Sequence, residues 1–158
     1  MRLHRLALAA LLLVGHAASA ADLGEGRAPE VRLVPSNVPF CENPKVLAQV
    51  EDQFEYGAPN MLEADLAILE FRDLFEKGYI PATEEFPIER RYCQGEVVIS
   101  TGKKHALYYV IEFPMGFAAA GAYLGAFSPV KGWKAQGCVL GLDHWYIYGA
   151  NCQSLRRF

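Results

Sequence analysis

The chain has 158 residues, of which 52% are hydrophobic and 21% are charged, and its formal net charge is −3. This length and composition are typical of one globular domain with a hydrophobic core, and they exclude a disordered or low-complexity chain. An acidic chain without clusters of basic and aromatic residues also argues against nucleic acid as a partner.

The first 20 residues have the three parts of a secretory signal peptide. Arg2 and Arg5 are positively charged, residues 6–14 form an apolar run, and Ala-Ser-Ala at 18–20 is a small-residue cleavage site. The apolar run is too short to span a bilayer, which takes about 20 residues. We therefore expect cleavage after Ala20, export to the periplasm or the cell exterior, and no stable membrane span afterwards. An uncleaved anchor or a buried N-terminal helix is the alternative.

The rest of the chain divides into a leader and one domain. Residues 21–40 contain glycine, proline and charged residues without a hydrophobic period, which predicts an extended leader, and residues 41–158 are predicted to form a single domain. The formal net charge is −9 over residues 42–89 and +5 over residues 90–158. The two halves are expected to pack together and partly neutralise each other. The alternative is a basic face that docks an anionic partner.

The predicted domain contains four cysteines, Cys41, Cys93, Cys138 and Cys152. An even number of cysteines in an exported protein predicts disulfides, and four cysteines allow three pairings. We favour Cys41–Cys93 with Cys138–Cys152. A zinc site is a less favoured alternative because no C-x-x-C pair is present, and a cysteine–histidine catalytic pair is another. We expect no metal and no other cofactor.

A helix is the first predicted regular element of the domain. Asn43 is a suitable N-cap, and Pro44 is tolerated at the first helical position. Apolar residues then recur at helical spacing, at Val46, Leu47, Val50 and Phe54. Gly57 and Pro59 are expected to end this helix.

The pattern of residues 66–75 fits either a strand or a helix. The alternation of Ala67, Leu69 and Phe71 suits a strand, whereas apolar residues at 62, 66 and 69 partly suit a helix. We predict a strand, which Gly78 and Pro81 should end.

Residues 90–113 have the clearest structural signal, which is that of a β-hairpin. Val97-Val98-Ile99 favours a strand, Thr101-Gly102-Lys103 favours a turn, and residues 105–113 favour a second strand. The second strand is apolar on both faces. It should therefore lie in the centre of the sheet, covered by the helix on one side and by another layer or subunit on the other.

Three further segments complete the domain. Residues 114–127 are rich in glycine and alanine, which predicts a loop or short buried helix on the sheet, or a loop that contacts a membrane or an oligomer partner. Residues 129–137 are predicted to form a basic loop. Residues 138–152 are predicted to form a second hairpin with Asp143 in its turn. Together these elements predict an α+β fold, with one main helix packed on a curved antiparallel sheet of four to five strands and two disulfides.

Three short motifs carry a resemblance to a known group of proteins. They are R-Y-C at 91–93, Y-Y-V-I-E at 108–112 followed by M-G-F at 115–117, and G-L-D-x-W-x-x-Y-G-x-N-C at 141–152. With these motifs, the sequence resembles a family of small exported bacterial proteins without a known activity, over about residues 40–156. The resemblance implies one compact disulfide-containing domain. In the order of its elements, the chain is also similar in outline to cystatin-like and NTF2-like domains.

Aromatic and basic side chains near the predicted turns are the candidate binding residues. They are Trp133, Trp145, Tyr146 and Tyr148, with Lys131 and Lys134 supplying charge. Aromatic faces can stack on sugars or anchor a protein partner. We therefore expect a non-catalytic binding or inhibitory module of the cell envelope, whose partner is a protein or a glycan. The alternative role for these aromatic side chains is to fill the core beside a disulfide.

Two other functions stay open. One is a small hydrolase or isomerase, since Glu112, Asp143 and His144 are candidate acid–base residues and a buried Glu112 near His144 could move a proton. Glu112 has a structural alternative as the partner of Arg90 or Arg91, and the chain contains neither G-x-S-x-G nor H-E-x-x-H. The other function is that of a structural or assembly protein that forms a homodimer or larger homo-oligomer.

Overall fold

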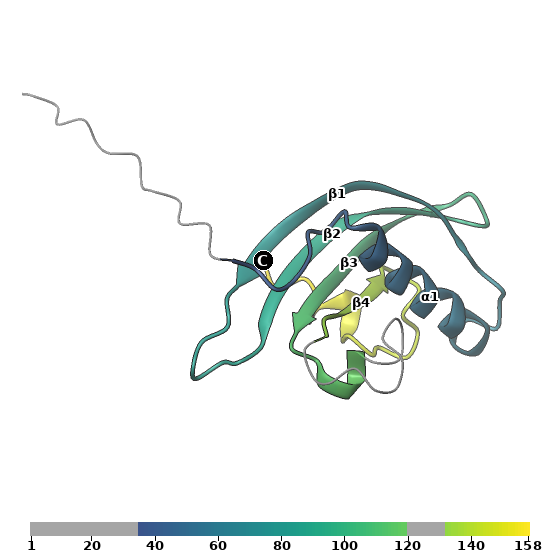
Figure 1. The fold of residues 1–158 in the computed structure, drawn as a ribbon. Coiled ribbons are helices and arrows are strands. Elements are labelled where there is room, and N and C mark those ends of the chain that lie inside the picture. Colours follow the sequence, from purple (N-terminus) through teal and green to yellow (C-terminus); the bar gives the residue numbers. More distant parts are fainter. Residues whose placement is uncertain (1–34, 120–131) are drawn as a thin grey trace, which may run out of the picture. The chain divides into compact units, whose positions relative to one another are not determined.

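The computed structural model describes residues 35–119 and 132–158. These residues form one α-helix, α1 (Pro44–Met61), and four strands, β1 (Ile68–Ile80), β2 (Glu89–Ile99), β3 (Lys104–Phe113) and β4 (Lys134–Val139). Two short 3-10 helices are η1 (Gly116–Ala119) and η2 (Ala150–Cys152). The strands pair in chain order as one antiparallel sheet (Figure 1). The predicted α+β fold is confirmed, with four strands.

Several predictions concern residues outside the described ranges. These are the signal peptide at 1–20, most of the leader at 21–40, the greater part of the segment 114–127, and Lys131. Within the described ranges, no helix is long and apolar enough to cross a membrane.

The start of α1 follows the prediction. Asn43 Oδ1 accepts a hydrogen bond of 2.9 Å from the backbone N–H of Lys45, so Asn43 caps the helix. Of the predicted apolar positions, Val46, Val50 and Phe54 are buried and Leu47 is partly buried, and Ala58 is buried as well.

The end of α1 differs from the prediction, because neither Gly57 nor Pro59 ends the helix. It continues to Met61, and the N–H of Leu62 donates a hydrogen bond of 2.8 Å to Ala58 O. A proline inside a helix removes one backbone hydrogen bond. Here the residue before it, Ala58, is fully buried in the core, and this packing holds the last turn in place.

The hairpin prediction for residues 90–113 is confirmed. β2 pairs with β3 from Glu89 opposite Phe113 to Val98 opposite Lys104. Gly102 in the turn has a φ of +77°, a conformation that glycine adopts at little cost. β3 lies between β2 and β4, as its two apolar faces predict.

β1 confirms the strand prediction for this region, and it ends at Ile80, directly before Pro81, one of the two residues expected to end it. Its register against β2 shifts at three places, and Asp73 at the middle shift has a φ of +49°. Each bulge adds a residue and bends the strand without ending it. Gly78, the other residue expected to end the strand, lies inside β1. The ring of Phe158 packs on it, and a Cβ there would lie 2.8 Å from Phe158 Cδ2.

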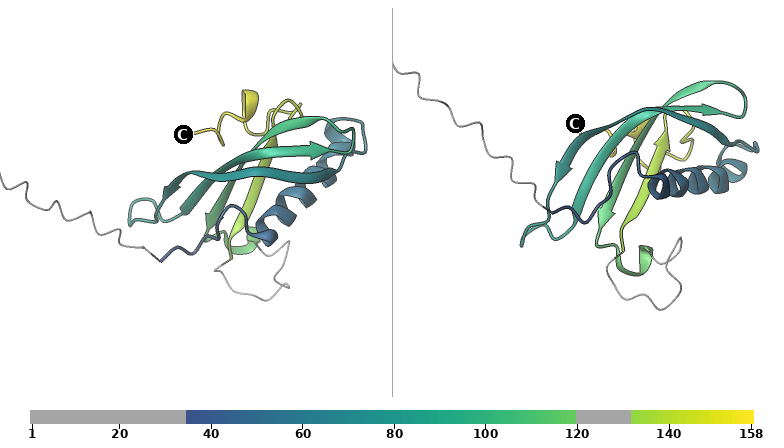
Figure 2. Two further views of the ribbon diagram at one scale, coloured as in Figure 1. Left: turned by 90° about the horizontal axis from the view of Figure 1, so that it is seen from above. Right: turned by 45° about the horizontal axis from the view of Figure 1, so that its top comes forward.

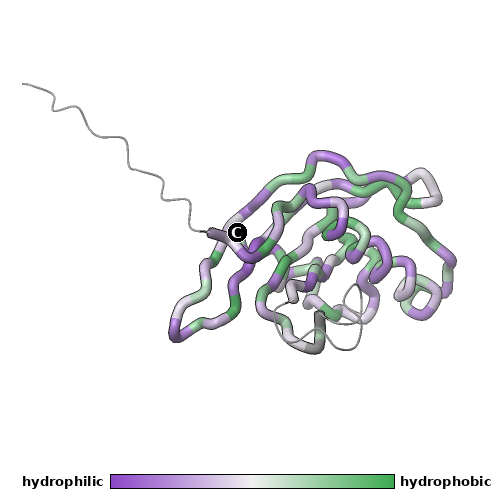
Figure 3. Tube along the Cα trace, in the orientation of Figure 1, coloured by the Kyte–Doolittle hydropathy of each residue, from purple (hydrophilic) through white to green (hydrophobic). Residues whose placement is uncertain are grey.

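Side chains alternate across the sheet and divide the core into two layers. Figure 3 shows the hydropathy of the residues along the same strands. The layer beneath α1 contains Cys93, Val97, Ile99, Leu107, Tyr109, Ile111, Ala135 and Val139. The opposite layer contains Tyr92, Val110 and Cys138, which pack with Cys152 and Leu155. The C-terminal residues 140–158 therefore form the second cover that the two-sided apolar strand predicted (Figure 2).

The sheet is not strongly curled, so the curvature that we predicted is not confirmed (Figure 2).

The prediction of a second hairpin over residues 138–152 is wrong. β4 ends at Val139, and turns and η2 follow it. Tyr146 and Asn151 have φ angles of +52° and +55°, which lie in the left-handed region and interrupt an extended strand.

Both disulfides of the favoured pairing are present. Cys41–Cys93 joins the residues before α1 to β2, and Cys138–Cys152 joins β4 to η2, with a Cα–Cα distance of 5.8 Å in each. All four thiols are thereby consumed, which leaves none for a zinc site or for thiol catalysis.

The residues just before α1 belong to the folded domain. Glu89, at the start of β2, is 2% exposed. Its carboxylate accepts hydrogen bonds from four residues, Ser36, Asn37, Val38 and Tyr79. Val38 itself lies in the core, so the last part of the predicted leader packs onto the sheet.

Candidate functional site

Residues 143–148 form a segment that we call the aromatic loop. Trp145, Tyr146 and Ile147 in this loop are 62%, 66% and 57% exposed. Tyr148, the last residue of the loop, packs instead against the core layer around Cys152. The alternative role of filling the core therefore holds for Tyr148, whereas three consecutive large apolar side chains face solvent.

The aromatic loop is held by the carboxylate of its first residue. Asp143 Oδ1 accepts a hydrogen bond of 3.1 Å from the N–H of Ile147, and Oδ2 accepts one of 3.1 Å from the N–H of Tyr148. The N–H of Tyr146 donates to Asp143 O at 3.1 Å. Aspartate commonly stabilises turns in this way. The loop thus has a defined conformation without a partner.

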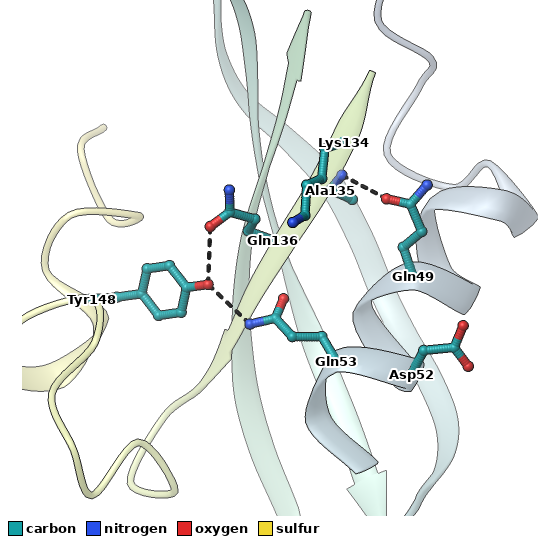
Figure 4. Close-up of a pocket in the computed structure, with 7 residues that line it drawn as sticks. All are labelled: Gln49, Asp52, Gln53, Lys134, Ala135, Gln136 and Tyr148. Carbon is teal, nitrogen blue, oxygen red and sulfur yellow. Dashed lines mark hydrogen bonds between the residues drawn. The ribbon is translucent and has the colours of Figure 1, made fainter. Parts of the chain in front are cut away.

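A polar groove with a volume of about 290 Å³ lies beside the aromatic loop (Figure 4). Its lining comes from α1 (Gln49, Asp52 and Gln53), from β4 (Lys134, Ala135 and Gln136) and from Tyr148. Two of the predicted binding residues, Lys134 and Tyr148, therefore line the same groove. We call this feature the polar groove.

Two glutamines of α1, one helical turn apart, occupy the outer edge of β4. Gln49 Oε1 accepts a hydrogen bond of 2.9 Å from Ala135 N–H. Gln53 Oε1 accepts from Gly137 N–H at 2.9 Å, and Gln53 Nε2 donates to Gly137 O at 3.2 Å. The Gln53 carboxamide therefore bonds both backbone groups of Gly137, as a residue of a neighbouring strand would.

Gly137 allows this close approach of α1. A Cβ atom on Gly137 would lie 2.6 Å from Val50 Cγ1, which is closer than two carbon atoms can pack. The missing side chain lets the helix backbone come near enough for the glutamines to reach the strand edge.

The hydroxyl of Tyr148 connects α1 to β4 across the polar groove (Figure 4). It accepts a hydrogen bond of 2.9 Å from Gln53 Nε2 and donates one of 3.2 Å to Gln136 Oε1. Burial is the main cause that raises the pKa of Tyr148 above its ordinary value. The phenol therefore stays protonated at neutral pH and acts as a fixed hydrogen-bonding group.

The three candidate acid–base residues do not form a pair. Glu112 Oε1 accepts from Arg90 Nε at 2.7 Å, which is the structural alternative that we expected for this carboxylate. The Asp143 carboxylate is committed to the backbone of the aromatic loop. His144 is exposed and has no hydrogen bond among residues 35–119 and 132–158. This geometry provides no proton relay among the three.

Trp133, another predicted binding residue, is half-buried and packs against the core layer beneath α1.

Sequence reasoning missed four lining residues of the polar groove, which are Gln49, Asp52, Gln53 and Gln136. Their only signal was the spacing of two glutamines four residues apart, which does not reveal the strand that they contact.

Only one ion pair in the described part of the chain joins the acidic half to the basic half, and it connects Arg91 to Glu76. The other pairs lie within one half, and they are Arg72–Glu70, Arg90–Glu112 and Lys104–Glu96. On α1, burial together with the charges of Glu55 and Asp52 raises the pKa of Glu51. Within residues 35–119 and 132–158, no carboxylate of α1 forms an ion pair with the basic half.

Among the described residues, no group of three histidine, cysteine, aspartate or glutamate side chains could hold a metal ion.

No protein-family model, no curated protein and no solved structure matches this chain. The function is therefore argued from the aromatic loop and the polar groove.

Proposed function

We propose that the protein is an exported, non-catalytic binding module of the cell envelope, which holds a protein partner through the aromatic loop. The observation that carries the proposal is the exposure of Trp145, Tyr146 and Ile147 on a loop that Asp143 holds in place. Contiguous exposed apolar side chains are typical of interaction surfaces.

The composition of the aromatic loop favours a protein over a glycan. Tryptophan and tyrosine are enriched among the residues that dominate binding energies at protein interfaces. Sugars stack on aromatic rings, whereas the branched aliphatic side chain of Ile147 suits an apolar hollow on a protein. A preformed loop also loses little conformational entropy on binding, which favours affinity.

The compartment belongs to the same proposal. Two disulfides indicate an oxidising environment outside the cytoplasm. The pattern of residues 1–20 supports cleavage after Ala20 and delivery to the periplasm or the cell exterior. The similarity in outline to cystatin-like and NTF2-like domains is part of the proposal as a fold-level analogy, and it assigns no function.

The test is site-specific crosslinking in the cells that produce the protein. A photo-crosslinking residue in place of Trp145 should yield one discrete protein adduct. The same residue in place of Phe86, which is 60% exposed in the β1–β2 connection, should yield none. With the purified partner, W145A should raise the dissociation constant about 30-fold, and F86A should leave it unchanged.

Equal labelling from the two positions, or no adduct at Trp145, would contradict the proposal. An adduct with a second copy of this chain would favour the homo-oligomer alternative, and an adduct with a glycan would replace the protein partner.

A further inference from the structure

We infer that the disulfide Cys138–Cys152 is a redox switch, which a dithiol on another protein opens while the rest of the domain stays folded. Opening the bond would release the segment that contains the aromatic loop from its covalent attachment to β4. The consequence for a protein partner rests on the proposed function, whereas the opening of the bond does not.

The backbone at Cys152 is held in a conformation that residues with a side chain rarely adopt. Asn151 and Cys152 have φ angles of +55° and +58°, which lie in the left-handed region. A residue other than glycine costs free energy there and keeps this conformation only where the surrounding structure imposes it. The bridge to β4 is a covalent constraint on Cys152. Opening the bridge lets both residues relax, so the backbone favours the reduced state.

A hydrogen-bond acceptor for the reduced state is already in place. Asp143 Oδ2 lies 3.7 Å from Cys138 Sγ, a distance that suits a hydrogen bond from a sulfur donor. A disulfide sulfur carries no hydrogen, so this hydrogen bond forms only when Cys138 becomes a thiol. The carboxylate therefore stabilises the thiol and not the disulfide.

The other disulfide, Cys41–Cys93, is held differently. Among the described residues with a positive φ, neither of its cysteines is found. Both lie in the core layer beneath α1, and the hydroxyl of Tyr109 donates a hydrogen bond of 3.0 Å to Cys41 O. Cys93 is paired with Glu76 on one side and with Tyr109 on the other. The folded structure keeps these two cysteines together by itself, so this disulfide should resist reduction.

A cavity gives a reductant access to the bridge Cys138–Cys152. The two cysteines are only 3% and 1% exposed, so the turns around them must move before a thiol reaches the sulfur atoms. A cavity of about 130 Å³ lies beside Cys152, and its other lining residues all fall within residues 141–151. Displacement of this one segment therefore uncovers the bond.

The exchange is balanced by one dithiol. A thiolate of the dithiol attacks Cys152 Sγ, the S–S bond breaks, and Cys138 Sγ leaves and takes up a proton. The second thiol of the dithiol then attacks its own first sulfur in the mixed disulfide, which releases Cys152 as a thiol. The dithiol departs as a disulfide, and it has supplied two electrons and two protons.

The end of the chain stays attached after the bridge opens, because non-covalent contacts hold it. The guanidinium of Arg156 lies 5.1 Å from the ring centroid of Tyr108, and the rings of Phe158 and Tyr92 pack edge to face with centroids 5.3 Å apart. The segment that contains the aromatic loop therefore loosens between two fixed points, β4 and the C-terminal residues. The switch changes the loop and leaves the fold intact.

The experiment is a redox titration of the mature protein in buffers of defined potential made from glutathione or from dithiothreitol. N-ethylmaleimide blocks the free thiols, and mass spectrometry locates them. We expect Cys138–Cys152 to be reduced with an equilibrium constant about 100-fold larger than that of Cys41–Cys93, which corresponds to about 60 mV. Reduction of both bonds at one potential, or of Cys41–Cys93 first, would overturn the inference.

Two glycine substitutions test the role of the backbone. N151G removes the cost of the left-handed conformation, so it should stabilise the disulfide and lower the equilibrium constant for reduction about fivefold. Glu63 has a φ of +52° and is exposed like Asn151, but it lies between α1 and β1. E63G is therefore the matched control and should leave the constant unchanged. No change in N151G, or an equal change in E63G, would overturn the proposed origin of the switch.

Hydrogen exchange tests whether the switch reaches the aromatic loop. In a buffer that reduces only Cys138–Cys152, the amides of residues 143–152 should exchange at least tenfold faster, and those of β2 and β3 should be unchanged. Faster exchange throughout the domain, or unchanged exchange in residues 143–152, would overturn the switch. Crosslinking from position 145 tests the protein partner separately, so its failure would leave these measurements unaffected.

Discussion

Glu89 is a buried carboxylate that ties the residues before α1 to the sheet. Burial alone would raise the pKa of Glu89, but the hydrogen bonds from Ser36, Asn37, Tyr79 and Val38 together hold that pKa below its ordinary value. The charged form is therefore the one that the folded protein stabilises. A carboxylate of this kind contributes stability above the ordinary carboxyl pKa, and the contribution is lost as the pH falls through the lower pKa of the folded state.

We expect E89Q to lower the free energy of unfolding at neutral pH by about 3 kcal/mol, because the amide replaces an acceptor with a donor that faces other donors. The difference should shrink towards about pH 3, where the carboxyl of the unfolded chain is protonated. Urea denaturation at both pH values measures this effect. E85Q is the matched control, because Glu85 is exposed between β1 and β2, and it should behave as the unmodified protein does. A pH-independent loss in E89Q would contradict the role of the charge.

Among the strands, β4 is the one that α1 contacts most extensively. The two glutamines of α1 complete the hydrogen bonds along the edge of β4, and Gly137 provides the space for the helix. A sheet edge with free backbone groups can pair with another strand. Here glutamine side chains take the place that another strand would occupy.

We expect G137A to destabilise the protein by about 2 kcal/mol, because the new methyl group would push Val50 and α1 away from β4. Adding V50A should recover part of this loss, although V50A alone should be destabilising. Chemical denaturation of the two single variants and the double variant forms a double-mutant cycle. Strictly additive effects would show that the contact between Gly137 and Val50 does not limit the approach of the helix.

The elements differ in how far the sequence predicts them. Residues 90–113 contain β-branched residues on both sides of a glycine turn, so local preference and tertiary structure agree, and the hairpin was predictable. The C-terminal segment was not, because Asp143 binds the backbone that a strand would use and Tyr146 adopts a positive φ. The polar groove depends on contacts between residues that are far apart in the chain, such as the 84-residue separation of Gln53 and Gly137. Periodicity does not detect such contacts.

At the scale of the whole molecule, both faces and both edges of the sheet are protected within the described residues. α1 covers one face, and residues 140–158 cover the other. The glutamines of α1 occupy one edge, and three bulges interrupt the other along β1. Bulges and covered edges are the features by which proteins avoid pairing of their sheets.

We therefore expect the purified mature protein to be a monomer. Sedimentation equilibrium should give the mass of one chain over a wide range of protein concentration. A stable dimer would contradict this expectation and would favour the assembly function. In that case, sedimentation equilibrium of W145A and F86A would locate the contact. A dimer weakened by W145A and not by F86A would place the contact at the aromatic loop, and a dimer unaffected by W145A would point to the sheet.

The positions of the two disulfides along the chain also bear on how the protein would form during the export that we propose. The bridge Cys41–Cys93 closes before Cys138 is reached in the sequence, so the two covalent loops neither overlap nor enclose one another. A chain that crosses a membrane from its N-terminus presents its cysteines to an oxidant in this same order. Joining each cysteine to the next one that emerges yields the native pairs. We therefore expect maturation to require an oxidant but no enzyme that reshuffles disulfides.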